Sequence, residues 1–233
     1  MSSGVNINRH LEQIGDALLH DLEAKNSARE KALADSRATI RNCAQSVRAT
    51  HRAEFDRARE LLAEAAAQVA ATRTTLAAAP DIYWTGYVQD AQKEFAEASI
   101  IHAVVAGQIV PGPAELGVEA APYLNGLGEA AGEMRRYVLD IIRHGELARG
   151  EEVLGVMEEI YSLLVTIDYP DAVTNGLRRT TDMVRGVLER TRGDLTFASR
   201  QQILTQALAQ HLPAGAAADL PGYMPAGDDG EGA

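Results

Sequence analysis

The longest stretch of this sequence without a helix-breaking residue lies near its N-terminus and limits the folds open to the chain. No proline occurs before Pro80, and no glycine occurs between Gly15 and Gly86. Because proline and glycine are the residues that most destabilise helix interiors, this segment favours continuous helix over about sixty residues. We expect either one very long helix or two helices with a bend near residues 50–54.

Apolar residues in the same segment recur every three or four positions, which places them on one helix face. They are Ile7, Leu11, Ile14, Leu18 and Leu22, and later Phe55, Ala58, Leu62, Ala65 and Val69. Further helices are expected at about residues 82–108, 119–143, 150–167, 171–192 and 196–211. We expect Asp81 to cap the first of these, and Gly145 and Gly193 to end the second and the fourth. No segment reads as a strand, so the predicted fold is all-α, an antiparallel bundle of about seven helices.

Length and composition favour a single intracellular domain. The 233 residues suit a helical domain over residues 1–212, followed by a tail over residues 213–233 that is rich in Pro, Gly, Ala and Asp and is expected to be disordered. The one cysteine, Cys43, allows no disulfide within the chain and indicates a reducing compartment. No stretch approaches the roughly 18 apolar residues of a membrane span. We therefore expect a cytoplasmic protein without a membrane partner.

The net charge of −11 argues against a simple basic nucleic-acid coat protein. It is compatible with a nuclease, which needs a local acidic group for a metal ion. Two pairs of glutamates supply such candidates, because Glu94 and Glu97 share one helix face and Glu129 and Glu133 share another. Carboxylates supplied by two helices of a bundle can hold a divalent cation, and hard oxygen ligands favour Mg²⁺ or Mn²⁺. Spacing alone leaves a solvated acidic face as the commoner interpretation. The sequence has no Glu-x-x-His motif, which argues against a di-iron centre.

Two motifs at these glutamates resemble the translin family, and more closely its translin-associated factor X branch. Glu94-Phe-Ala-Glu97-Ala98 is similar to that branch's Glu-Tyr-x-Glu-Ala. The second motif, Tyr123-Leu-Asn-Gly-Leu-Gly-Glu129-Ala-Ala-Gly-Glu133-Met-Arg-Arg136, is similar to Tyr-Leu-x-Gly-Val-x-Asp-Leu-x-Gly-Glu-Leu-x-Arg. The second motif is the more specific because it matches without a gap. The resemblance covers roughly residues 5–200, with a weaker likeness from Leu177 to Gly193.

The resemblance implies a curved bundle of seven helices that assembles into closed, barrel-like octamers. It also implies a Mg²⁺- or Mn²⁺-dependent endoribonuclease that acts on single-stranded RNA, because that is the activity of the factor X branch. On this basis Glu94, Glu97 and Glu129 are the expected catalytic carboxylates, and Glu133 is an adjacent fourth candidate for the metal. A homo-octamer or another homo-oligomer is expected, and a paralogous partner is possible. One departure is that Glu129 stands where the family has an aspartate.

Several basic and aromatic residues are candidates for RNA contact, each with a structural alternative. Arg136 would contact phosphate or form an ion pair with Glu133. A stripe comprising Arg37, Arg41, Arg48, Arg52 and Arg59 would follow the backbone of a nucleic acid or form a solvated helix face. The family's basic segment at the start of the third helix is replaced here by Tyr83-Trp84-Thr-Gly-Tyr87, whose aromatic rings would stack on bases or pack within the fold.

Three functions remain open from the sequence. The first is a metal-dependent endoribonuclease within a homo-oligomeric barrel. The second is a non-catalytic translin-like protein that binds single-stranded RNA or DNA, and the third is a helical scaffold for protein interaction. Only the first requires the four glutamates to meet.

Overall fold

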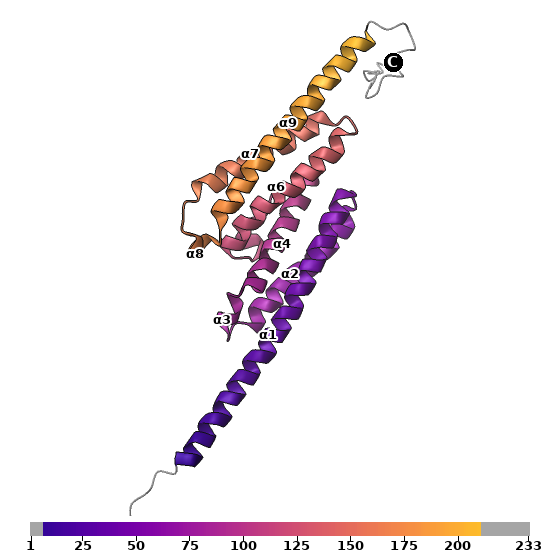
Figure 1. Cartoon of the computed structure of the whole chain (residues 1–233). Helices are drawn as coiled ribbons and strands as arrows, with labels where there is room; N and C mark the ends of the chain where they lie inside the picture. The colour runs from indigo at the N-terminus through magenta and orange to yellow at the C-terminus, as the bar shows by residue number, and fades with distance from the viewer. Residues whose placement is uncertain (1–6, 211–233) are drawn as a thin grey trace, which may run out of the picture. The chain divides into compact units, whose positions relative to one another are not determined.

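The computed structural model describes residues 7–210, and all regular elements in that range are helices (Figure 1). This confirms the all-α class. The six long helices are α1 Ile7–His51, α2 Phe55–Thr75, α4 Gly86–Val105, α6 Ala120–Ile142, α7 Leu147–Thr166 and α9 Leu177–Ala209. One-turn helices occur at α3 Pro80–Tyr83, α5 Pro113–Leu116 and α8 Asp171–Thr174. The tail predicted over residues 213–233 lies outside the described residues.

Of the two alternatives for the N-terminal segment, the structure shows two helices, with a short turn between α1 and α2. Ala53 has a φ of 57°, in the left-handed region that ends helices. The Glu54 N–H donates to the carbonyl of Ala49 at 2.9 Å, which satisfies an acceptor at the end of α1. The turn reverses the chain without a glycine or proline, and α1 and α2 then pack side by side.

The helices expected at about residues 82–108 and 171–192 are each interrupted, at residues 84–85 and 175–176. Two expected helix boundaries are also wrong. Asp81 is not an N-cap, because Pro80 occupies the first turn of α3 and Asp81 lies inside that turn, where it forms an ion pair with Lys25 at 2.9 Å. Gly193 does not end a helix, because α9 continues through it to Ala209. An interior glycine costs only about 1 kcal/mol relative to alanine, so flanking helix formers override it.

The described helices fall into two compact units, which divide within α6. The first, Met1–Gly126, contains α1 to α5 and the first turns of α6, and the second, Leu127–Ala233, contains the remainder. In the first unit, α1 packs against α2 and α4, and α2 also packs against α4. In the second unit, α7 packs against α9. None of the helices within residues 7–210 is both long enough and apolar enough to span a bilayer.

The packed face of α1 is made almost entirely of small residues. Its buried positions are Ala32, Ser36, Thr39, Cys43, Ser46, Ala49 and Thr50. Small side chains let neighbouring helices approach closely, and the larger core residues come from the neighbours, such as Leu61 on α2 and Phe95 on α4. The face of α1 that meets α2 and α4 is therefore narrow, and it mixes small apolar residues with serine and threonine.

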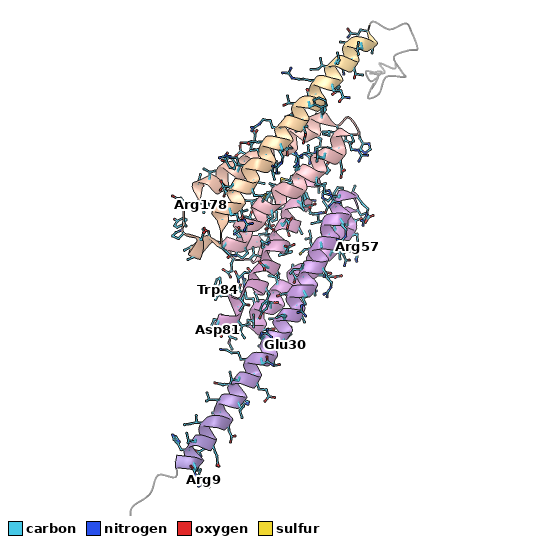
Figure 2. All side chains as sticks on the ribbon, in the orientation of Figure 1. Arg9, Glu30, Arg57, Asp81, Trp84 and Arg178 are labelled. Carbon is cyan, nitrogen blue, oxygen red and sulfur yellow. The ribbon has the colours of Figure 1, made fainter. Side chains whose placement is uncertain are left out.

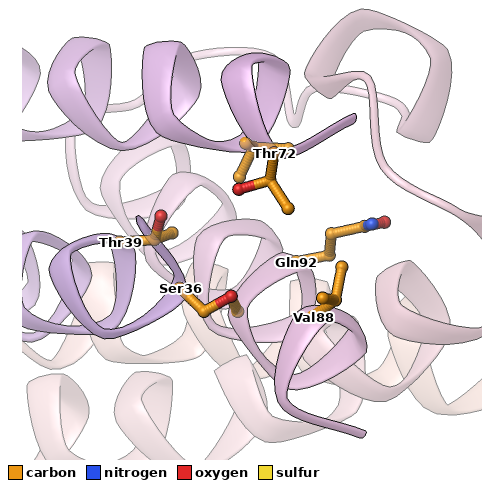
Figure 3. A pocket seen from close by; sticks show the side chains of 7 residues that line it. Ser36, Thr39, Thr72, Val88 and Gln92 are labelled. Carbon is orange, nitrogen blue, oxygen red and sulfur yellow. The ribbon is translucent and has the colours of Figure 1, made fainter. Parts of the chain in front are cut away.

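Ser36 and Ser46 lie on this face but differ in their hydrogen bonding. Ser36 lines a cavity of about 10 Å³, the size of one water molecule, together with Thr39, Thr72 and Gln92 (Figure 3). The Ser36 hydroxyl has no protein partner among the described residues. By contrast, the fully buried Ser46 hydroxyl donates to the carbonyl of Ala58 at 3.1 Å and so links α1 to α2.

We expect Ser46→Ala to lower the free energy of unfolding by about 1 kcal/mol, because a buried hydrogen bond between two helices is lost. We expect Ser36→Ala to change it by less than about 0.5 kcal/mol, because no protein hydrogen bond is lost. Urea denaturation of both variants under one set of conditions measures the difference. Equal losses for the two variants would contradict this account.

His102 on α4 is a buried base, and protonation of its imidazole destabilises the folded protein. Its side chain is 5% exposed, its Nδ1 lies 3.3 Å from Thr50 Oγ1, and its Nε2 has no protein partner among the described residues. Burial lowers the pKa of His102, and the nearby Arg59 guanidinium lowers it further. The folded state therefore binds this proton less readily than the unfolded state, where the pKa is about 6.5.

The contribution of His102 to stability is thus complete above about pH 6.5 and is lost as the pH falls below that value. We expect His102→Gln to flatten the decrease in unfolding free energy between pH 7.5 and pH 5.5. The matched control is His144→Gln, which removes an exposed histidine and should leave the slope as in the parent protein. Denaturant titrations at four pH values provide the measurement, and identical slopes for all three proteins would refute the assignment.

Candidate metal centre

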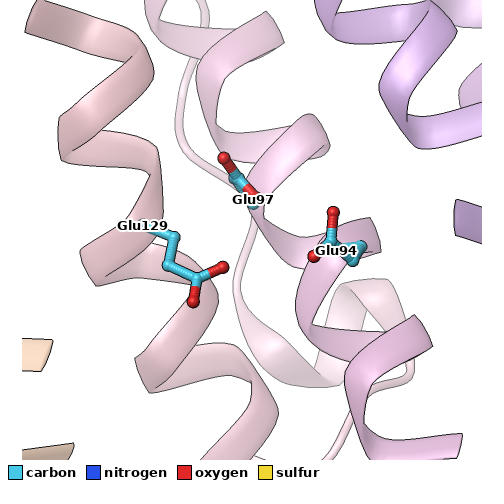
Figure 4. A group of neighbouring side chains, drawn as sticks. All are labelled: Glu94, Glu97 and Glu129. Atoms are coloured by element: carbon cyan, nitrogen blue, oxygen red, sulfur yellow. The ribbon is translucent and has the colours of Figure 1, made fainter. Parts of the chain in front are cut away.

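Three of the four predicted glutamates come together at one place in the fold. Glu94 and Glu97 lie on α4, one turn apart, and Glu129 lies on α6, with its carboxylate directed toward α4 (Figure 4). One carboxylate oxygen from each lies within 4.8 Å of the others, and all three side chains are half-buried. Two oxygens on opposite sides of one Mg²⁺ or Mn²⁺ would be about 4.2 Å apart, because each bond is about 2.1 Å long. Small side-chain rotations would therefore close the group around a single ion.

Gly126 is the residue that allows α6 to lie against α4 at this point. A Cβ atom added to Gly126 would lie 2.6 Å from the backbone carbonyl oxygen of Lys93 and 3.1 Å from the backbone nitrogen of Glu97. Neither atom can move without distorting α4, so only glycine fits. Glu129 follows three residues later, on the same continuous helix. The glycine thus brings the third carboxylate to the two on α4.

The surroundings of the carboxylates add one positive charge and one buried thiol. Lys93 Nζ lies 3.6 Å from Glu94 Oε1 and offsets part of the negative charge. Cys43, on the packed face of α1, is 1% exposed, and its pKa is raised by burial and by the negative charges of Glu94 and Glu97. The thiol therefore stays protonated, and α1 closes one side of the carboxylate group with a neutral, small side chain.

Glu133 stands apart from this group of three. It lies one turn beyond Glu129 on α6, and its Oε2 is 3.5 Å from Arg136 Nη1. Of the two expectations for Arg136, the ion pair is therefore present, while the guanidinium remains 55% exposed. Glu133 as a metal ligand and Arg136 as a phosphate contact stay predictions.

The arginine stripe lies on the opposite side of α1 from the carboxylates. Arg37, Arg41 and Arg48 are exposed and are spaced by four and seven residues, which places them on one face. That face is turned away from Cys43 and the packed positions. Arg52 forms a two-point ion pair with Glu54 at 2.7 and 2.8 Å, and Arg59 pairs with Asp56. RNA binding by the arginine stripe stays a prediction. An RNA strand bound to these arginines would lie on the side of α1 that faces away from the carboxylates.

Of the three aromatic rings in the segment Tyr83-Trp84-Thr-Gly-Tyr87, those of Tyr83 and Tyr87 pack against the core and that of Trp84 is exposed. Tyr83 donates a hydrogen bond to Glu119 at 2.7 Å and accepts one from Gln92 at 3.1 Å, so its role is structural. Trp84 packs edge-on against Tyr83 with centroids 5.2 Å apart and remains 60% exposed. Of these three rings, only Trp84 presents a largely exposed surface on which a base could stack.

Sequence reasoning missed the packing roles of the glycines in the second motif. Gly126 faces α4, whereas a Cβ on Gly128 would lie 2.3 Å from Thr180 Cγ2 on α9. A glycine inside a helical pattern signals close approach of another backbone, and two of them separated by one residue signal approach from two sides. Neither glycine indicates which helix lies against it.

Comparisons with known proteins identify relatives of this chain. No family model matches the chain. An uncharacterised protein of Methanocaldococcus jannaschii is 34% identical over 180 residues, which cover 76% of this chain and 79% of that protein. The crystal structure of AfC3PO and that of its complex with duplex RNA are both 30% identical with a TM-score of 0.74. Each match covers 83% of this chain and 98 to 99% of the AfC3PO chain. The chain belongs to the translin family.

A further solved structure shares this fold at a lower sequence identity. The crystal structure of apo-NeC3PO is 19% identical with a TM-score of 0.72, and the match covers 85% of this chain and all of that one. At that identity the likeness concerns the fold alone. The translin-type all-α fold expected from the two motifs is therefore confirmed.

Proposed function

We propose that this translin-family protein is a metal-dependent endoribonuclease of the factor X type that cleaves single-stranded RNA within a homo-oligomer. The observation that supports it most strongly is the meeting of Glu94, Glu97 and Glu129 within 4.8 Å. Membership of the family and the duplex RNA bound to AfC3PO support RNA as the substrate class. A homo-octamer, other homo-oligomers and a paralogous partner all remain compatible with this proposal.

The donor set fits a hard divalent cation. Three half-buried carboxylates in mutual proximity repel one another, and a cation in their midst removes that repulsion. Carboxylate oxygens are the ligands that Mg²⁺ and Mn²⁺ prefer, and the group of Glu94, Glu97 and Glu129 contains no soft ligand. Glu94, Glu97 and Glu129 would hold the ion.

Glu133 and Arg136 then have distinct roles in the proposed cleavage. A bound Mg²⁺ or Mn²⁺ supplies an activated water and neutralises charge on the phosphate. Glu133, one turn from Glu129, would accept a proton from the attacking water. Arg136, which pairs with Glu133 and is 55% exposed, would bind a phosphate oxygen.

The test is incubation of the protein with labelled single-stranded and duplex RNA in Mg²⁺ or Mn²⁺, with EDTA as a control. Glu129→Gln should abolish cleavage and retain RNA binding. The matched control is Asp140→Asn, which removes an exposed carboxylate from the same helix and should cleave normally. RNA binding without metal-dependent cleavage would favour a non-catalytic RNA- or DNA-binding protein. Absence of both would favour a helical scaffold.

A further inference from the structure

Gln92, two residues before Glu94 on α4, is a buried polar residue to which the proposed chemistry gives no role. It is 3% exposed, and both ends of its side-chain amide form hydrogen bonds. Gln92 Nε2 donates to the Tyr83 hydroxyl at 3.1 Å, and Gln92 Oε1 accepts from the backbone N–H of Glu119 at 2.8 Å. The first bond joins α4 to α3, and the second joins α4 to the residue directly before α6.

The side chain of Gln92 is also packed against α1 and α2. It lines the water-sized cavity together with Ser36 of α1 and Thr72 of α2, and Figure 3 shows its amide directed away from Ser36. A side chain whose orientation is fixed both by packing and by hydrogen bonds can hold another group precisely. For Gln92 that group is the backbone N–H of Glu119.

Tyr83 closes a ring of hydrogen bonds between Gln92 and Glu119. Its hydroxyl donates to Glu119 Oε1 at 2.7 Å while it accepts from Gln92. Burial raises the pKa of Tyr83, and the hydrogen bond to the Glu119 carboxylate raises it further, so the phenol keeps the proton that it donates. Asp81 and Trp84, on either side of Tyr83 in the chain, lie at the surface (Figure 2), whereas the Tyr83 hydroxyl is directed toward α4 and the start of α6.

Arg73, in the last turn of α2, makes a more exposed connection to the same segment. Its Nη2 donates to the backbone carbonyl of Gly117 at 2.7 Å and lies 3.4 Å from Glu119 Oε1. The Arg73 side chain is half exposed, so solvent screens its attraction to the carboxylate. Gln92 is buried, and its hydrogen bond to the Glu119 N–H is therefore the better protected of the two connections.

The first turns of α6 thus meet α4 at two points. At the helix start the Glu119 N–H bonds to Gln92, and roughly 10 Å further along, at the rise of an α-helix, Gly126 lies against the backbone of α4. The contact at the glycine lets the two helices approach, but a single point of contact does not fix the direction of α6. The hydrogen bond to Gln92 supplies the second point, and Glu129 follows three residues after Gly126 on the same helix.

We propose that Gln92 is a positioning residue for the metal centre. By holding the start of α6 against α4, it sets where the Glu129 carboxylate stands relative to Glu94 and Glu97, with which it forms the group within 4.8 Å. Its effect is transmitted through the backbone of α6. The inference rests on the metal-dependent nuclease of the proposed function, and it assigns to Gln92 an effect on metal affinity that is separate from its effect on stability.

The first experiment measures Mn²⁺ binding to the full chain from the electron paramagnetic resonance signal of the free ion. Gln92→Met keeps the length of the side chain and removes both hydrogen bonds. It should raise the dissociation constant for Mn²⁺ about tenfold, the lower end of the loss seen when support for metal ligands is removed. The matched control is Gln89→Met, one turn earlier on α4, which removes a hydrogen bond of 2.9 Å to the Tyr83 carbonyl and none to the α6 segment. The control should bind Mn²⁺ as the parent does.

Two further readouts separate positioning from a general loss of stability. Urea denaturation should show both glutamine variants to be less stable than the parent, because each loses a hydrogen bond to α3. In RNA cleavage, only Gln92→Met should need about tenfold more Mn²⁺ for half-maximal activity, in line with its weaker metal binding. The KM for RNA at saturating Mn²⁺ should stay as in the parent, since Gln92 has no contact with the substrate in this proposal.

Hydrogen exchange of the Glu119 amide tests the contact without metal. In Gln92→Met this amide should exchange on the order of tenfold faster than in the parent, and in Gln89→Met it should exchange at the parent's rate. Tyr83→Phe is a milder second variant, which removes only the hydroxyl that orients the Gln92 amide. It should weaken Mn²⁺ binding about threefold, and it keeps the test open if Gln92→Met does not fold.

The outcomes distinguish this inference from the proposed nuclease. Mn²⁺ binding by the parent with an unchanged dissociation constant in Gln92→Met and Tyr83→Phe would overturn the positioning role and leave the metal centre in place. Equal losses of Mn²⁺ affinity in Gln92→Met and Gln89→Met would also overturn it, because the effect would then follow stability. A parent protein that takes up no Mn²⁺ would overturn both the positioning role and the nuclease.

Discussion

Replacing Glu97 by glutamine is expected to remove Mg²⁺- and Mn²⁺-dependent RNA cleavage while raising the melting temperature of the metal-free protein. Glutamine keeps the shape of the side chain and removes one of three negative charges that lie within 4.8 Å of one another. Without metal those charges repel, so the variant is relieved of a cost that the parent carries. With metal the parent gains a ligand that the variant lacks.

Binding of an ion at 100 times its dissociation constant would stabilise the parent by about 2.7 kcal/mol. In a domain of this size that corresponds to a rise in melting temperature of roughly 5–10 °C. Glu97→Gln should show little of this rise, and its cleavage rate should fall by on the order of 100-fold or more, since even the loss of a residue that supports a metal ligand costs up to that factor.

Differential scanning calorimetry with EDTA and with Mn²⁺ provides the measurement. Asp90→Asn is the matched control, because it removes an exposed carboxylate from the same helix. It should respond to metal as the parent does. A parent protein whose melting temperature does not change with Mn²⁺ would refute the metal centre, whatever the variant does.

The second large effect is expected at Gly126, where any side chain would push α6 away from α4. Gly126→Ala places a methyl group 2.6 Å from the Lys93 carbonyl oxygen, which is part of the backbone and cannot rotate aside. Overpacking of this kind costs about 1–3 kcal/mol, and the gain of about 1 kcal/mol from replacing a helical glycine offsets only part of it. The same shift would displace Glu129, so the response to Mn²⁺ should also be lost.

Gly132 on the same helix is the matched control for this change. No atom lies within 4 Å of the position where a Cβ would stand. Gly132→Ala should therefore stabilise the protein by about 0.5–1 kcal/mol through helix propensity alone and keep the response to Mn²⁺. Opposite signs for two identical substitutions six residues apart would show that packing decides the effect. Equal effects in urea denaturation would contradict the role given to Gly126.

The sequence predicted those parts of the molecule that depend on local spacing. The long breaker-free segment, its turn near residue 53 and the shared faces of the glutamate pairs all follow from helical periodicity. Two predicted helix boundaries were wrong because the preference of a single residue was outweighed by its neighbours. Asp81 has the side chain of a cap, but Pro80 before it already starts a helical turn, and Gly193 is outweighed by helix formers on both sides.

The close contact of α4 with α6 could not be predicted from local sequence patterns. Spacing puts Glu94 beside Glu97, but the third carboxylate arrives only because Gly126 allows close contact between the two helices. The resemblance to the factor X branch named the same residues without a physical cause. It likewise did not separate Glu133 from the group of three, whereas in the structure only Glu94, Glu97 and Glu129 form that group.

The burial of Cys43 gives the protein an internal reporter of its own breathing motions. Its thiol is 1% exposed and held in the unreactive protonated form, so a thiol reagent can modify it only when α1 opens away from α4. The modification rate in native buffer is therefore a direct reading of how often that opening occurs. Because Glu94 and Glu97 lie near the same thiol, a bound ion that ties them in place would be seen as slower labelling, with no need for a substrate.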